Sequence, residues 1–212
     1  TQTIDLAPTI LDYFDIDIPP DVQGETLSSR MVSDKPTRGA VLYGVMGGQV
    51  NVTDGQYVYM RGHVTQDNTP LNDYTLMPTH MRSPFAPREL QQWDKFAGFS
   101  FLNGCEVMKI PTRTPKASLS DDNPFGRGKR ATLLFDVQAD PGQTNPLDDP
   151  EIEARMIKLM LLEMARNECP DEQYERLGLP RPSRLGDGHE DEMVQLPPED
   201  SIREACLLRT PA

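Results

Sequence analysis

Apolar residues recur at helical spacing near the beginning of the chain. They are Ile4, Leu6, Ala7, Ile10, Leu11 and Phe14, which fall on one face of a helix. Asp5 is suited to cap this helix and Pro8 to lie in its first turn, whereas Pro19 and Pro20 forbid its continuation. The pattern predicts a short amphipathic helix. It needs a partner surface, because a helix of about three turns is unstable alone in water.

The pattern then changes to one that is typical of strands. Residues 40–45, 49–54 and 56–62 are rich in β-branched and aromatic side chains. Gly47-Gly48 separates the first two segments, and Asp54-Gly55 separates the second pair. Because Asp-Gly between such segments favours a tight hairpin, we expect three consecutive antiparallel strands. Residues 74–78 are expected to add an edge strand.

The middle of the chain is poorly periodic. Residues 86–96 predict a helix, with Pro87 in its first turn, and Phe99 and Phe101 are expected to pack under a loop. Residues 112–130 are typical of a long surface loop.

The clearest unit runs from residue 131 to residue 168. Leu133, Leu134, Phe135 and Val137 predict a buried strand, and a turn at Asp140-Pro-Gly follows it. Asp149 and Pro150 then predict the start of a long helix, as its cap and its first residue. A broad apolar stripe on this helix suits packing across a sheet: Ile152, Met156, Ile157, Leu159, Met160, Leu161, Leu162 and Met164.

The composition changes again after Leu179. The following segment is rich in proline and acidic residues, which indicates an extended or disordered tail. Residues 201–210 are expected to form a last short helix, with Ser201 and Glu204 in capping-box spacing. The predicted fold is therefore α+β. It has a small antiparallel sheet of about four strands packed by a long C-terminal helix, a short N-terminal helix and an irregular acidic tail.

Composition and charge exclude several classes of protein. The 212 residues carry a formal net charge of -12, so the chain would repel a nucleic-acid backbone. No apolar run approaches the roughly 18 residues that a membrane span needs. Cys105, Cys169 and Cys206 show no metal-binding spacing, and reduced thiols are expected. The first residues resemble neither a start nor a signal peptide, so Thr1 is expected to be an artificial boundary.

Two segments resemble sulfatases of the alkaline phosphatase superfamily. In that family an Asp-x-x-Pro-Thr helix follows the catalytic core and leads to a Gly-x-Ser/Thr-Leu ending. The matching residues here are Asp5, Pro8, Thr9, Gly24, Thr26 and Leu27. The second segment is similar to the near-terminal strand and turn of the family, through Leu134, Phe135, Asp136, Val137, Asp140, Pro141 and Asn145. Phe135 stands where Tyr is usual, and Pro146 interrupts the usual Asn-Leu.

The resemblance implies that this chain is the C-terminal portion of a sulfatase. Residues 1–30 would be the linker helix and loop, residues 31–178 the C-terminal subdomain and residues 179–212 the tail. The Cys/Ser-x-Pro-x-Arg motif that is matured to formylglycine does not occur in the sequence. Formylglycine and a divalent cation, calcium, would belong to a missing N-terminal domain. That domain would be the main partner, and a sulfated small molecule or glycan the substrate. The chain alone is expected to be inactive.

Basic side chains of the subdomain are the candidates for the rim of a substrate cleft. They are Arg61, His63, His80 and Arg82. Guanidinium groups suit bidentate recognition of anions, and an imidazole can donate to a sulfate or sugar oxygen. The alternative for each is an ordinary loop or capping role. The acidic residues 12–21 lack the Gly and Glu of a helix-loop-helix calcium site, so solvated acids are the better interpretation.

Two other functions stay open at this point. One is a phosphonate or phosphodiester hydrolase of the same superfamily, and the other is a non-catalytic module that binds proteins. The compartment is open too, since both a cytoplasmic and a periplasmic protein fit. If the chain is a fragment, the apolar stripes of the first helix and of the long helix would be exposed, and self-association through them is expected.

Overall fold

The computed structural model of the chain describes residues 1–33, 38–80, 83–112, 131–185 and 193–208. These residues divide into two compact units, Thr1–Gly39 and Ala40–Ala212. Of the predicted surface loop at 112–130, residues 113–130 lie outside the described residues. Among the described helices, none combines the length and the apolar character that a membrane span requires.

The first unit contains the predicted N-terminal helix. A 3-10 turn, η1 (Thr3–Asp5), leads into α1 (Leu6–Tyr13), and α2 (Ser28–Val32) follows after a long loop. The Asp5 side chain does not cap α1 as predicted. It accepts instead from the backbone of Gln2, before the 3-10 turn. As expected, the apolar side chains of this helix are largely exposed: Ile4, Leu6, Ile10, Tyr13 and Phe14.

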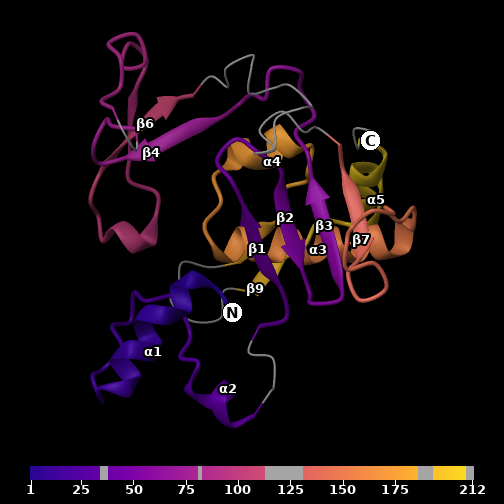
Figure 1. The fold of residues 1–212 in the computed structure, drawn as a ribbon. Helices are drawn as coiled ribbons and strands as arrows, with labels where there is room; N and C mark the ends of the chain where they lie inside the picture. Colours follow the sequence, from indigo (N-terminus) through magenta and orange to yellow (C-terminus); the bar gives the residue numbers. More distant parts are fainter. Residues whose placement is uncertain (34–37, 81–82, 113–130, 186–192, 209–212) are drawn as a thin grey trace. The chain divides into compact units, whose positions relative to one another are not determined.

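The second unit is built on a four-stranded antiparallel sheet in the order β1-β2-β3-β7 (Figure 1). The strands are β1 (Val41–Gly44), β2 (Val50–Thr53), β3 (Tyr57–Arg61) and β7 (Leu133–Asp136). They confirm the three predicted consecutive strands and the predicted buried strand. Gly55, between β2 and β3, has φ +92, a conformation that favours glycine and explains the Asp-Gly turn.

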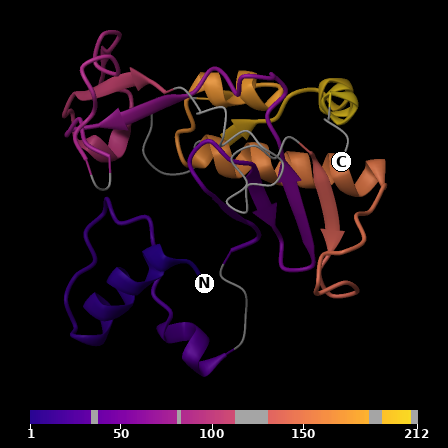
Figure 2. The same ribbon diagram turned by 45° about the horizontal axis from the view of Figure 1, so that its top comes forward.

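The long helix α3 (Pro150–Arg166) covers one face of this sheet (Figures 1 and 2). Leu42, Val52, Tyr59 and Leu134 lie in one row across the four strands and share a face. They pack with the apolar stripe of α3, of which Met156, Ile157, Met160, Leu161 and Met164 are buried. The expectation that this stripe would be exposed is therefore wrong, because the sheet covers it. Asp149 caps the helix as predicted, by accepting from the amides of Glu151 and Ile152.

A separate three-stranded sheet lies between β3 and β7 in the sequence. Its order is β4-β6-β5, with β4 (Asn72–Thr75), β5 (Asp94–Phe96) and β6 (Val107–Pro111). The predicted edge strand thus forms as β4, slightly earlier and in this second sheet. The predicted helix at 86–96 is wrong, since turns and then β5 occupy that segment. Pairing of β5 with β6 overrides the local helix preference.

The C-terminal segment is part of the second unit. It contains α4 (Asp171–Leu177), the paired strands β8 (Ser183–Leu185) and β9 (Met193–Gln195), and α5 (Glu199–Leu207). The predicted last helix is confirmed, but Pro198 precedes it and the predicted capping box of Ser201 does not form. Leu179, Ile202 and Ala205 are buried in the main core, so this part of the predicted tail is packed.

A buried guanidinium joins the C-terminal helices to the sheet. Arg61, at the end of β3, is 0% exposed. Its Nε donates to the carbonyl of Leu177 at 2.8 Å, and its Nη2 to that of Gly178 at 3.1 Å. Its Nη1 donates to the carbonyl of Ala205 at 3.0 Å and to the Tyr59 hydroxyl at 3.1 Å. One side chain therefore connects β3, the end of α4 and α5. We call it the Arg61 clamp.

We expect Arg61→Met to destabilise the second unit by about 3–5 kcal/mol, because it leaves buried carbonyls without donors. Urea unfolding followed by circular dichroism measures the change. The control is Arg166→Met on the surface of α3, where the side chain is 65% exposed and pairs with Glu163. That variant should stay within about 0.5 kcal/mol of the wild type. Equal stabilities of the two variants would contradict the clamp.

Candidate functional site

The structure places two of the four predicted rim residues in the interior. Arg61 forms the clamp described above. His63 is 0% exposed, and its Nδ1 lies 2.6 Å from the carbonyl oxygen of Thr65. Arg61 is the last residue of β3, and His63 comes two residues later. Helix α4 packs at this point, since the Val64 amide donates to the Arg176 carbonyl at 3.0 Å. The structure therefore gives Arg61 a structural role, whereas Arg82 lies outside the described residues.

His80 is the predicted rim residue that faces solvent, with 45% of its side chain exposed. It lies on a short turn after β4 that the backbone closes. Its amide donates to the Ser83 carbonyl at 2.7 Å, and the Phe85 amide donates to the Pro78 carbonyl at 2.8 Å. Phe85 is buried, and its ring centroid lies 4.2 Å from that of the imidazole. The turn and this ring together fix where the imidazole lies.

Glu89 holds one nitrogen of this imidazole. His80 Nε2 lies 2.9 Å from Glu89 Oε1, and the other carboxylate oxygen accepts from the Ala86 amide at 2.6 Å. The Ala86 amide and then His80 lower the pKa of the Glu89 carboxyl, so it is ionised at neutral pH. The sequence did not single out Glu89, because its segment was interpreted as a helix. The sequence did contain a signal for this pair, because Glu89 is a carboxylate only nine residues after His80.

A second cluster lies in the first unit, around the carboxylate of Asp5. This residue is 1% exposed. Its oxygens accept from Arg38 Nη1 at 2.8 Å and Nη2 at 2.6 Å, and from the amides of Gln2 at 2.8 Å and Glu25 at 3.1 Å. The bidentate pair with Arg38 holds the pKa of the Asp5 carboxyl far below its usual range. Asp5 thereby joins Glu25, near the end of the long loop, and Arg38, which lies beyond α2, to the turn that precedes α1.

Thr9 continues the cluster one turn along α1. Its hydroxyl donates to the Asp5 carbonyl at 2.5 Å and accepts from the Leu27 amide at 2.9 Å. The Thr26 hydroxyl donates to Asp12 at 2.7 Å, which is a second link between the loop and the helix. We call the cluster of Asp5, Thr9, Glu25, Thr26, Leu27 and Arg38 the N-terminal network.

Gly24 allows the loop to approach α1 closely. A Cβ atom at this position would lie 2.1 Å from the carbonyl oxygen of Ile4 and 3.1 Å from Cγ of Pro8. No side chain fits there without movement of the backbone. The six residues that carry the first part of the family resemblance thus lie on one small helix and on the loop that it holds.

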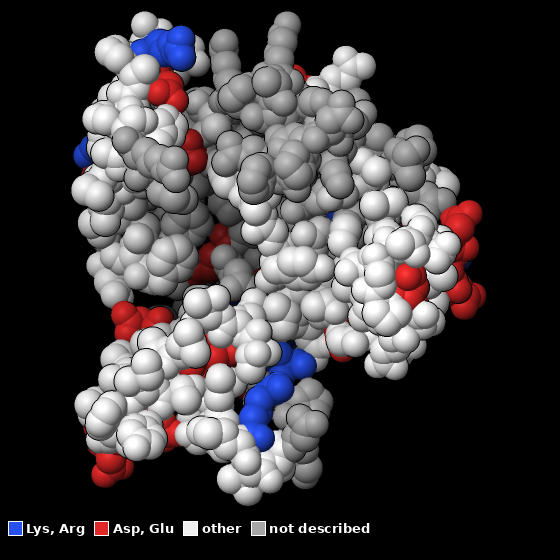
Figure 3. Space-filling view, in the orientation of Figure 1, with Lys and Arg blue, Asp and Glu red and all other residues white. Residues whose placement is uncertain are grey.

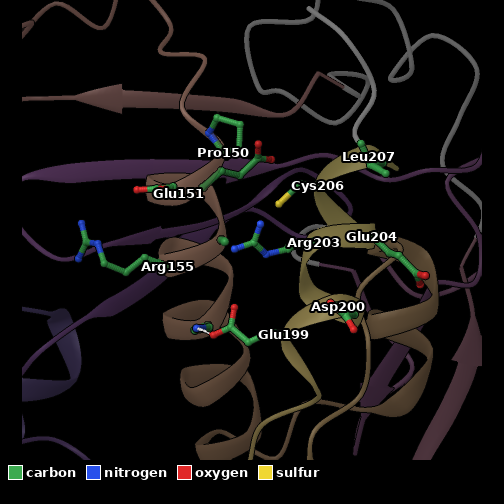
Figure 4. A pocket seen from close by; sticks show the side chains of 12 residues that line it. Pro150, Glu151, Arg155, Glu199, Asp200, Arg203, Glu204, Cys206 and Leu207 are labelled. Carbon is green, nitrogen blue, oxygen red and sulfur yellow. Dashed lines mark hydrogen bonds and ion pairs between the residues drawn. The ribbon is translucent and has the colours of Figure 1, made fainter.

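A pocket with a volume of about 870 Å³ lies between α3 and α5. Its wall carries both signs of charge: Lys158 of α3 pairs with Glu199 of α5, and Arg203 extends from α5 toward α3 (Figure 4). The Cys206 thiol donates to the Ile202 carbonyl of its own helix. These mixed charges select no particular class of ligand.

A smaller pocket of about 440 Å³ lies beside α4, where the second sheet meets it. The Glu172 carboxylate accepts there from Asn72 at 2.8 Å, from Lys109 at 3.2 Å and from the Tyr74 hydroxyl. Burial raises the pKa of Glu172, but these donors outweigh it and lower the pKa overall. Burial and the carboxylate raise the pKa of Tyr74. The pairing fixes the second sheet to α4.

The described residues offer no metal centre: no group of three or more His, Cys, Asp or Glu side chains lies close enough to hold an ion. Cys105, Cys169 and Cys206 are not joined to one another by disulfides. On the face drawn in Figure 3, acidic side chains occur in several separate groups, in keeping with the net charge of -12. The arrangement supplies positioned hydrogen-bond donors and acceptors.

We expect the N-terminal network to weaken in acid. The Asp5 pKa is lowered on folding, so its stabilisation is complete above the unfolded-state pKa of about 3.9 and is lost as the pH falls below it. Hydrogen exchange of the Glu25 and Leu27 amides measures this. Asp5→Asn should raise their exchange about tenfold or more at neutral pH, whereas Asp17→Asn, at an exposed position, should not. Unchanged protection in Asp5→Asn would contradict the network.

We expect Gly24→Ala to loosen the same loop, because its Cβ would collide with the backbone of Ile4. Limited trypsin digestion should cut after Arg30 about fivefold faster than in the wild type. Gly39→Ala is the matched control, since nothing lies within 4 Å of a Cβ there. Equal digestion of the two variants would show that the close approach does not matter.

Comparison with known proteins adds no identification. No family model matches the chain, and no curated protein matches it.

Proposed function

We propose that the chain is the C-terminal portion of a sulfatase, an enzyme that hydrolyses sulfuric esters, and that it flanks the active-site cleft. The N-terminal network is the observation that carries this proposal. Asp5, Thr9 and Leu27, which were matched to the family from sequence alone, are joined by hydrogen bonds. Gly24 is required by the close approach of the same loop. The residues that match the family motif therefore share one structural role, which is to hold the loop against α1.

The order of the later elements supports the same proposal. The four-stranded antiparallel sheet follows the linker helix, and β7, the Asp140 turn and α3 then come in the order that the resemblance implies. Asp140 accepts from the amides of Thr144 and Asn145, at 2.7 and 2.8 Å. The Asp-Pro turn of the second motif is thus closed by its own aspartate.

The role of this chain in such an enzyme is to position and to bind. Hydrolysis of a sulfate ester requires a nucleophile, a divalent cation that neutralises the sulfate oxygens, and a general acid. Formylglycine and calcium would supply the first two from a domain outside the printed sequence. The second sheet and the His80 turn would shape the side of the cleft and exclude water from it.

Two alternatives stay open. A phosphonate or phosphodiester hydrolase of the same superfamily would use the same supporting elements. A non-catalytic protein-binding module is favoured by one observation, the exposed apolar side chains of the first unit, such as Tyr13 at 79% and Val32 at 90%.

The complete gene product and the 212-residue chain should be assayed side by side with 4-nitrophenyl sulfate. We expect turnover by the complete product and none by the chain alone. A phosphonate monoester and a phosphodiester of 4-nitrophenol discriminate the related hydrolases. Gly24→Ala in the complete product should lower the rate, whereas Gly39→Ala should not.

Two results would overturn the proposal. One is turnover of the sulfate ester by the 212-residue chain itself. The other is a complete gene that encodes no Cys/Ser-x-Pro-x-Arg motif.

A further inference from the structure

The two nitrogens of His80 have different surroundings. Nε2 faces Glu89 at 2.9 Å, whereas no hydrogen-bond partner for Nδ1 lies among the described residues. The nitrogens of an imidazole lie on opposite sides of the ring, so Nδ1 points away from the carboxylate. With 45% of its side chain exposed, His80 can present Nδ1 to a ligand from solvent.

Glu89 determines which nitrogen carries the proton. An ionised carboxylate only accepts, so Nε2 must donate to it. In the imidazolium form both ring nitrogens donate, so Nδ1 then becomes a second donor. In many functional sites a carboxylate orients a histidine in this way, by accepting from one ring nitrogen while the other nitrogen faces the ligand.

Three further contacts keep the pair in place. The Ala86 amide donates to the second oxygen of Glu89 at 2.6 Å, the buried Phe85 ring packs on the imidazole, and the backbone closes the turn between Pro78 and Phe85. Arg88 is a further cation whose charge acts on Glu89. Among the described residues, a protonated His80 and Arg88 both bring positive charge to this carboxylate, which favours an anionic ligand.

We infer that His80 contacts an anionic oxygen through Nδ1–H and that Glu89 is its positioning residue. This inference rests on the proposed function for the identity of the anion, a sulfate or phosphonate group. Of the predicted rim residues it selects His80 and not Arg61, whose guanidinium is buried in the clamp. It also adds Glu89, which lies nine residues after His80 in the chain.

Nitrogen-15 NMR of the histidine rings in this chain tests the inference without any need for hydrolysis. His80→Gln assigns the His80 signals among the three histidines. In the wild type we expect the neutral ring to carry its proton on Nε2. At a pH at which the ring is doubly protonated and Nδ1 also carries a proton, added sodium sulfate or phenylphosphonate should shift the Nδ1 signal in a saturable manner, beyond sodium chloride at the same ionic strength.

The variants separate positioning from a general effect of charge. Glu89→Gln should give a mixture of tautomers and about fivefold or more weaker anion binding, and Glu89→Asp should restore part of both. Glu106→Gln is the matched control, because it removes a carboxylate that pairs with Lys95 in the same part of the unit. The wild-type tautomer in Glu89→Gln, or a shift no larger than that with chloride, would overturn the inference.

These readouts distinguish failure of the inference from failure of the proposed function. Anion binding at His80 without ester hydrolysis by the complete product would support the inference and contradict the proposed sulfatase function. Hydrolysis by the complete product, with no response of His80 to either anion, would support the proposed function and contradict the inference.

Discussion

The Arg61 clamp is the interaction on which the second unit most depends. A guanidinium can be buried only where several acceptors surround it, and carbonyls at the end of a helix lack partners of their own. Leu177 and Gly178 end α4 and supply two such carbonyls, and Ala205 supplies a third from α5. The clamp and the helix carbonyls therefore satisfy one another. Helices α4 and α5 are held to the sheet by these hydrogen bonds as well as by apolar contact, because removal of either partner would leave buried groups unpaired.

The first unit is organised by a different principle. It has almost no apolar interior of its own, since Asp5 and Pro8 are its buried residues among those described. Hydrogen bonds to one carboxylate and one hydroxyl hold its loop on α1 instead. Such a small unit gains little from hydrophobic burial. Its exposed apolar side chains and its polar network fit a connecting segment, and this is the role that the proposed sulfatase architecture gives it.

The sequence determined those elements whose signals are local. The Asp54-Gly55 turn fixes how β2 meets β3, and the cap at Asp149 fixes where α3 begins, because each acts within a few residues of its own position. The β-branched and aromatic residues predicted the first three strands, and the broad apolar stripe predicted a helix that packs on a sheet. The sequence failed where a partner outside the segment overrides its local preference: β5 forms because β6 is available to it, although the segment that ends in β5 favours a helix.

The same limit of prediction from sequence applies to the candidate site. The sequence alone identified His80, Arg61 and His63 as basic residues after strands, and it could not tell a surface residue from a clamp. Burial depends on α4 and α5, which approach the end of β3 from more than a hundred residues away in the chain. The pairing of His80 with Glu89 was likewise decided by the closed turn that brings them together. Residue type sets which chemistry a side chain can perform, but only packing sets what it faces, because exposure and hydrogen-bond partners are properties of the assembled fold.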